Sequence, residues 1–188
     1  GTDPLVATII VAPTFINDGV SCDGPAESFT ITVNPTAQVN IPADQVVCNT
    51  ELTTMLFTTE NTVGVTTYAW TSDIEIGAGL TGAADGFPVL YTAINLGTEP
   101  LVATIIVTPT FTNDGVGCVG PTESFTITVN PTGQVDITAD QVVCNAEATT
   151  VVFTTENTVG VTAYAWTSDI EIGAGLTGAG DMSFTAAN

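Results

Sequence analysis

The stretch GTDPLVATIIV at residues 1–11 returns, with one change, as GTEPLVATIIV at residues 97–107. The likeness extends well beyond these strands, because residues 1–85 and 97–181 differ at only 15 of 85 aligned positions. The sequence therefore repeats with a period of 96 residues. Near-identical tandem copies predict an array of like modules, and a module of about 100 residues is typical of a β-sandwich.

The two repeats are residues 1–96 and 97–188, and each contains a series of short strand patterns. Residues 28–33, SFTITV, alternate between apolar and polar side chains, as expected of a strand with one buried face. Residues 5–11, LVATIIV, are apolar on both faces, which favours a central strand. The NDG at residues 17–19 is typical of a tight turn between two strands. Further strands are expected at residues 53–59, 65–71 and 87–93, with short candidates at 37–41 and 44–48.

Module boundaries are predicted at the NPT motifs, residues 34–36 and 130–132, because proline cannot continue a strand ladder. The complete module then covers residues 36–131. Residues 1–35 are the last strands of a preceding module, and residues 132–188 are the first strands of a following one. The expected fold is all-β, with immunoglobulin-like antiparallel sandwiches in a linear array.

Neither incomplete module is expected to bury a core by itself, but the two are complementary. The segment 132–188 lacks the strands that LVATIIV and SFTITV provide, and residues 1–35 carry those strands. Two arrangements satisfy this pattern: a window on a longer covalent array, or a separate subunit that lends a hairpin to its neighbour. In both, the expected partners are copies of the same sequence, joined head to tail.

The composition excludes several functions, because the chain has no lysine, arginine or histidine, against 20 aspartate and glutamate residues. Without an imidazole base or a Schiff-base lysine, we expect no enzyme activity and no catalytic residues. Without basic side chains we expect no nucleic-acid binding, and an anionic membrane would repel the surface. No apolar run is long enough to insert into a membrane. The absence of trypsin sites suits an exposed, extracellular protein.

The cysteines at 22, 48, 118 and 144 lack the spacing of zinc or thioredoxin-like sites. An even number in a secreted protein indicates disulfides. The favoured pair is Cys48 with Cys118, which would close every complete module, leaving Cys22 and Cys144 to pair with neighbouring material. The alternative pairs Cys22 with Cys48 and Cys118 with Cys144, connecting one module to the next.

The pattern FTITVNPT…VVCN…YAWTSD…FTAAN-GT…VATIIVTPTF resembles the PKD-like, immunoglobulin-like repeats of very large bacterial surface proteins exported by type IX secretion, often in gliding species. The resemblance covers essentially the whole chain. It implies a role in attachment, gliding or cell–cell adhesion and a location at the bacterial cell surface, and it brings no active site. Where PKD domains usually continue Trp-Asp-Phe-Gly-Asp-Gly, this chain has TSDIEIG after Trp70.

Three groups of side chains are candidate sites with simpler structural interpretations. The aromatic residues Tyr68, Trp70, Tyr164 and Trp166 could stack on sugars, but their spacing favours core positions on one strand face. Asp73 and Glu75 could form a carboxylate pair, but solvated surface charges are the better interpretation. Asp18, Asp23 and Asp114 could bind Ca²⁺, but plain turns are the better interpretation. No cofactor or metal is otherwise expected.

These observations predict a structural repeat of an extracellular bacterial filament or giant surface adhesin. Its role would be that of a stiff spacer built from sandwiches linked head to tail. The alternative is a non-catalytic glycan- or calcium-binding module of a secreted protein.

Overall fold

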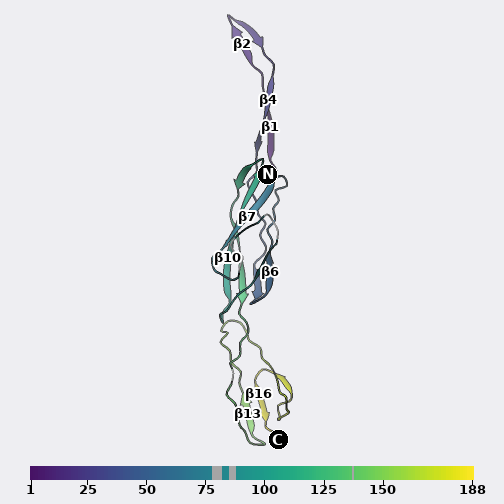
Figure 1. The fold of residues 1–188 in the computed structure, drawn as a ribbon, viewed down its shortest axis with the longest axis vertical. Helices are drawn as coiled ribbons and strands as arrows, with labels where there is room; N and C mark the ends of the chain where they lie inside the picture. Colours follow the sequence, from purple (N-terminus) through teal and green to yellow (C-terminus); the bar gives the residue numbers. More distant parts are fainter. Residues whose placement is uncertain (78–81, 85–87, 137) are drawn as a thin grey trace.

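In the computed structural model, which describes residues 1–77, 82–84, 88–136 and 138–188, the described part of the chain is elongated and contains strands but no helix (Figure 1). The strands are β1 (Leu5–Val11), β2 (Thr14–Asn17), β3 (Val20–Asp23), β4 (Glu27–Val33), β5 (Gln45–Cys48), β6 (Leu52–Met55), β7 (Val65–Ser72), β8 (Gly82–Ala84), β9 (Val89–Thr92), β10 (Leu101–Asn113), β11 (Val116–Val119), β12 (Glu123–Asn130), β13 (Ala148–Val151), β14 (Ala165–Thr167), β15 (Thr177–Ala179) and β16 (Met182–Thr185).

The largest sheet has the strand order β5-β12-β10-β7-β8, and β11 pairs with the end of β10. Strand β10 is antiparallel to both β12 and β7, whereas β5 lies parallel to β12. With a partner on each side, β10 continues through Pro109 as a single strand of 13 residues. Its sequence therefore behaves as the central strand that its apolar character predicts.

A smaller sheet, β6 with β9, supplies the opposite side of the core. Met55 from β6 and Tyr91 from β9 are at most 2% exposed and share one cluster with Ile105 and Ile127 of the large sheet. Tyr91 also donates a hydrogen bond from its hydroxyl to Gln45 Oε1 at 3.2 Å. Two sheets facing one apolar core are consistent with a β-sandwich, here called the central unit (residues 36–131).

The N-terminal hairpin (residues 5–33) projects from the central unit, with β2 at the far end of the molecule (Figure 1). Strand β1 pairs with β4 and β2 pairs with β3, all antiparallel. Every residue of β2, β3 and β4 is exposed. This hairpin is therefore a two-stranded ribbon with neither face covered.

The C-terminal segment (residues 132–188) lies at the other end of the molecule (Figure 1). It forms two small sheets, β13 with β16 and β14 with β15. Among its described residues only Ala186 is buried, at 8% exposure. This segment has strand pairs but no packed core.

Most strand predictions agree with the structure, and the differences have local causes. Strands β1, β4, β5 and β7 match their predicted ranges to within a residue. The predicted turn is confirmed, because Asp18 and Gly19 have φ of 46° and 77°, as a tight hairpin turn requires. The expected strand at 37–41 is wrong: only an isolated bridge joins Asn40 to Thr58.

Two other predicted strands are shorter than expected. The prediction for 53–59 is correct only up to Met55, where β6 ends. The prediction for 87–93 corresponds to β9, and its first residue lies outside the described residues.

Candidate functional site: an exposed hairpin and an open groove

The N-terminal hairpin and the strand pair β10–β12 share their inward-facing residues but differ in burial. Phe29 and Ile31 are 53% and 48% exposed, whereas the identical residues Phe125 and Ile127 are 4% and 0% exposed. The same apolar sequence is therefore exposed to solvent in the N-terminal hairpin and buried in the core of the central unit. The identical inward-facing pairs are Ala7/Ala103, Ile9/Ile105, Val11/Val107, Pro13/Pro109, Phe15/Phe111, Phe29/Phe125, Ile31/Ile127 and Val33/Val129.

In the central unit, β12 is held by side chains as well as by its strand partners. Phe125 packs edge-on against Phe57, with ring centroids 6.3 Å apart. At the start of β5, Asp44 Oδ1 accepts a hydrogen bond from the Thr126 backbone N–H at 2.7 Å. The aromatic contact buries apolar surface, and the carboxylate bonds to the backbone at one register of the two strands.

Strand β10 is held in a corresponding way by Asp73, which follows β7. Asp73 Oδ1 accepts a hydrogen bond from the Thr104 backbone N–H at 2.7 Å. That bond lowers the pKa of the Asp73 carboxyl below its ordinary value, because it stabilises the charged form. Asp73, considered in the sequence as half of a catalytic pair with Glu75, therefore has a structural role.

A buried asparagine closes the end of the central unit. Asn95 is 1% exposed, and its Nδ2 donates to the carbonyl oxygens of Val129 and Glu99 at 2.7 and 2.8 Å. Its Oδ1 accepts from the Gly97 N–H at 3.0 Å, and its own N–H donates to Asn49 Oδ1 at 2.9 Å. Asn95 thus ties the end of β12 to the segment that leads into β10.

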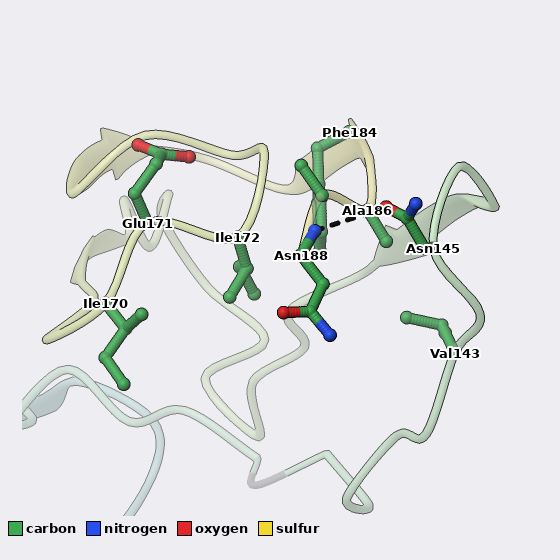
Figure 2. Close-up of a pocket in the computed structure, with 9 residues that line it drawn as sticks. Val143, Asn145, Ile170, Glu171, Ile172, Phe184, Ala186 and Asn188 are labelled. Carbon is green, nitrogen blue, oxygen red and sulfur yellow. Dashed lines mark hydrogen bonds between the residues drawn. The ribbon is translucent and has the colours of Figure 1, made fainter.

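The C-terminal segment has an open groove where the central unit has its core (Figure 2). A cavity of about 580 Å³ is lined by Val143, Ile172, Phe184 and Asn188, among others. Val143 and Ile172 are 37% and 41% exposed, whereas their equivalents in the first repeat, Val47 and Ile76, are 7% and 0% exposed. A second cavity of about 300 Å³, lined in part by Phe153, lies in the same segment.

The groove retains one of the hydrogen bonds by which Asn95 closes the central unit. The Asn188 N–H donates to Asn145 Oδ1 at 3.2 Å, as Asn95 does to Asn49. The identical sequence DQVVC contains strand β5 at residues 44–48 but is not a strand at residues 140–144. Segment 140–144 thus has the same sequence as the β5 region, but it lacks a neighbour equivalent to β12, with which β5 pairs.

The four cysteines are free thiols, so the predicted Cys48–Cys118 pair is not formed in this structure. Cys48 lies opposite Asn130, at one end of the β10–β12 ladder, and Cys118 lies opposite Phe111, near the other end. Leu101 and Phe111 are ten positions apart in β10, which corresponds to about 33 Å. A disulfide needs Cα atoms within about 7 Å of each other.

The four aromatic candidates are buried in the central unit but only half-buried in the C-terminal segment. Tyr68 and Trp70 are buried in the core at 2% and 5% exposure, and burial raises the pKa of the Tyr68 phenol. Tyr164 and Trp166 are half-buried, and the Trp166 Nε1–H is buried without a hydrogen-bond partner.

The calcium candidates do not form a cluster. Asp18 and Asp114 each occupy a left-handed turn position, with φ of 46° and 49°, and Asp23 lies at the end of β3, where Thr14 donates to it. Among the described residues there is no group of three or more histidine, cysteine or acidic side chains placed to hold a metal.

The sequence interpretation missed Asn95, Asn49 and the role of Asp44 and Asp73 as acceptors for strand amides. Their signal is that each recurs in the second repeat, as Asn188, Asn145, Asp140 and Asp169. Hydrophobic patterning does not reveal such residues, because their partners are backbone groups distant in sequence.

No protein-family model matches the chain, and no curated protein matches it. The part of the chain that the structure describes holds no helix long and apolar enough to cross a membrane.

Proposed function

We propose that this protein is a structural repeat of an extracellular bacterial surface filament or giant adhesin. Immunoglobulin-like, PKD-like sandwiches would be joined head to tail, the N-terminal hairpin of a donor copy completing the C-terminal segment of an acceptor copy. One observation carries the proposal: of the eight inward-facing residues of the hairpin, seven are exposed and Ile9 is half-buried, whereas the eight identical residues of the central unit are all buried. The proposed occupant of the groove is therefore a second copy of this chain.

The central unit supplies the register of the docked hairpin. Ile127 lies opposite Gln45, and Val107 lies opposite Trp70. The equivalent residues of the docked pair follow from the repeat of 96 residues. Ile31 of the donor would lie opposite Gln141 of the acceptor, and Val11 of the donor would lie opposite Trp166 of the acceptor. Phe29 then meets Phe153 as Phe125 meets Phe57, and segment 140–144 acquires the neighbour that it needs to become a strand.

The polar groups of the acceptor also match the donor. Asp140 and Asp169 would accept the backbone amides of Thr30 and Thr8, as Asp44 and Asp73 accept those of Thr126 and Thr104 in the central unit. Asn188 would donate to the carbonyl groups of Asp3 and Val33 on the donor. These bonds define one register, because a shift of a single residue would place the apolar face of the hairpin in water.

Junction hydrogen bonds support the stiffness of the array. Asn61 Nδ2 donates to the Thr2 carbonyl at 3.0 Å, and Asn157 Nδ2 donates to the Thr98 carbonyl at the same distance. Both hairpins are thus fixed to the unit that follows them by the same contact. A net charge of −20 keeps such an apolar strand protein soluble, and the lack of lysine and arginine protects it from trypsin-like proteases outside the cell.

Sedimentation velocity of the reduced chain tests the proposal. We expect a mass that grows with concentration in whole multiples of the 19.2 kDa chain. Replacing Ile31 with aspartate should abolish growth, because a charge would enter the acceptor core. Ser28→Asp is the matched control, because its equivalent Ser124 is exposed in the central unit. A chain that stays monomeric at all concentrations would overturn the proposal, as would equal growth by both variants.

A further inference from the structure

We infer that the four cysteines join neighbouring copies through two disulfides per junction: Cys22 of the donor with Cys48 of the acceptor, and Cys118 of the donor with Cys144 of the acceptor. The inference rests on the proposed head-to-tail assembly. It uses every thiol in the chain and explains why each is free in a single copy.

The first step is the position of the acceptor thiols. In the central unit, the register of β5 and β12 places Cys48 opposite Asn130. Cys144 is the repeat equivalent of Cys48, and Asn34 is the repeat equivalent of Asn130. The same register therefore places Cys144 of the acceptor opposite Asn34 of the donor. Neighbouring strands lie about 4.8 Å apart, so Cys144 would lie directly beside Asn34.

The second step is the position of the donor thiol relative to Asn34. Asn34 Nδ2 donates to the carbonyls of Asn113 and Val116 at 3.3 and 3.4 Å, and Asn113 Nδ2 donates to Asn34 Oδ1 at 3.0 Å. The turn between β10 and β11 is thereby fixed against the base of the hairpin. Cys118 lies in β11, two residues beyond Val116.

A cavity connects the two positions. It measures about 340 Å³ and is lined by Thr32, Val33 and Asn34 on one side and by Cys118 on the other, with Asn113, Asp114 and Val116. Its lining includes residues of β4 but none of β1, which is consistent with a position at the edge of β4 that β1 leaves free. That is the edge beside which segment 140–144 of the acceptor would pair, bringing Cys144 to the cavity that Cys118 lines.

The other pair follows from the repeat. Cys22 lies opposite Phe15 in the N-terminal hairpin, as Cys118 lies opposite Phe111. The turn between β2 and β3 of the donor would then contact Asn130 of the acceptor, beside which Cys48 is already placed. The two disulfides would be one period apart along the junction.

Thiol–disulfide exchange with a small-molecule disulfide such as oxidised glutathione supplies the chemistry. One cysteine thiolate attacks the glutathione disulfide, which forms a mixed disulfide and releases one glutathione thiol. The second cysteine attacks the protein sulfur of the mixed disulfide and releases the other glutathione. For each bond, two protein thiols are oxidised and one glutathione disulfide is reduced to two thiols.

Four double variants of the full chain test the inference, each oxidised with glutathione disulfide after assembly and run on a non-reducing denaturing gel. C118S/C144S keeps the Cys22–Cys48 pair, and C22S/C48S keeps the Cys118–Cys144 pair. Both should give a ladder at multiples of 19.2 kDa that reductant collapses. C22S/C144S and C48S/C118S keep thiols that are not partners, and both should run as single chains.

Sedimentation of the same samples before oxidation separates the two proposals. Assembly without any ladder would overturn the disulfide inference and leave the proposed function intact. A ladder from C22S/C144S or C48S/C118S as strong as that from the other two variants would also overturn it. A fast-migrating single chain from C22S/C144S would reveal a Cys48–Cys118 bond within one chain, which excludes the proposed pairing. Neither assembly nor ladder in any variant would overturn both proposals.

Discussion

Residues 5–33 and residues 101–129 are nearly the same sequence in two environments. The first is an exposed two-stranded ribbon, whereas the second lies between β7 and β5 and forms the core of the central unit. Strand β1 ends at Val11 and β2 begins at Thr14, but β10 runs through the equivalent positions without a break. The continuous strand therefore depends on β7, which pairs with β10 but has no equivalent beside β1.

Segments 44–48 and 140–144 show the same effect from the acceptor side. Both read DQVVC, but only the first contains a strand, because β12 lies beside it. Strand propensity is thus the same in both places and does not decide the outcome. The presence of a pairing partner decides it, in agreement with the strong context dependence of β-structure.

The largest expected effect comes from truncating one phenylalanine in each environment. Phe125→Ala should lower the free energy of unfolding of the central unit by about 3–5 kcal/mol, because it leaves a cavity beside Phe57. Phe29→Ala should leave the unfolding of the dilute, reduced chain unchanged. Urea denaturation of both variants measures the difference. Equal losses would mean that the hairpin is already packed in a single copy.

Replacing the closing asparagine should have a smaller effect. Asn95→Ala should cost about 1–3 kcal/mol, because the carbonyls of Val129 and Glu99 lose their donor. Asn188→Ala should have no effect on a single copy but should weaken assembly. Thermal unfolding reports the first change and sedimentation the second. An Asn188→Ala chain that assembles like the wild type would contradict the equivalence of the two asparagines.

The low pKa of Asp73 predicts a pH dependence confined to acid. Its folded-state pKa lies below the unfolded value, so its contribution is present above about pH 4 and is lost as the pH falls through the folded pKa. Asp73→Asn should therefore lower the melting temperature at pH 7 and have little effect at pH 2. An equal decrease at both pH values would show that the carboxylate charge is irrelevant to holding Thr104.

Salt should have the smallest effect. With a net charge of −20 and no basic side chain, the carboxylates repel one another, and 0.1 M salt limits this repulsion to about 10 Å. The melting temperature of the dilute chain should rise modestly from low to moderate salt, and scanning calorimetry measures it. A melting temperature that does not change with salt would contradict this expectation.

The sequence predicted the strands and the turn because these depend on local patterns. SFTITV alternates, and the NDG turn needs positive φ only at Asp18 and Gly19. The expected strand at 37–41 failed because Asn40 makes only a single bridge to Thr58, which no local pattern reveals. The Cys48–Cys118 pair is not formed in this structure, where the two cysteines lie near opposite ends of the β10–β12 ladder.

The central claim is that the hairpin of one copy completes the groove of another, and hydrogen exchange tests it most directly. The reduced chain should be followed by mass spectrometry from low to high concentration, with residues 44–48 as the internal standard for residues 140–144. We expect segment 140–144 to exchange quickly in the dilute chain and to become as protected as 44–48 on assembly. Assembly that leaves segment 140–144 exchanging quickly would contradict the account.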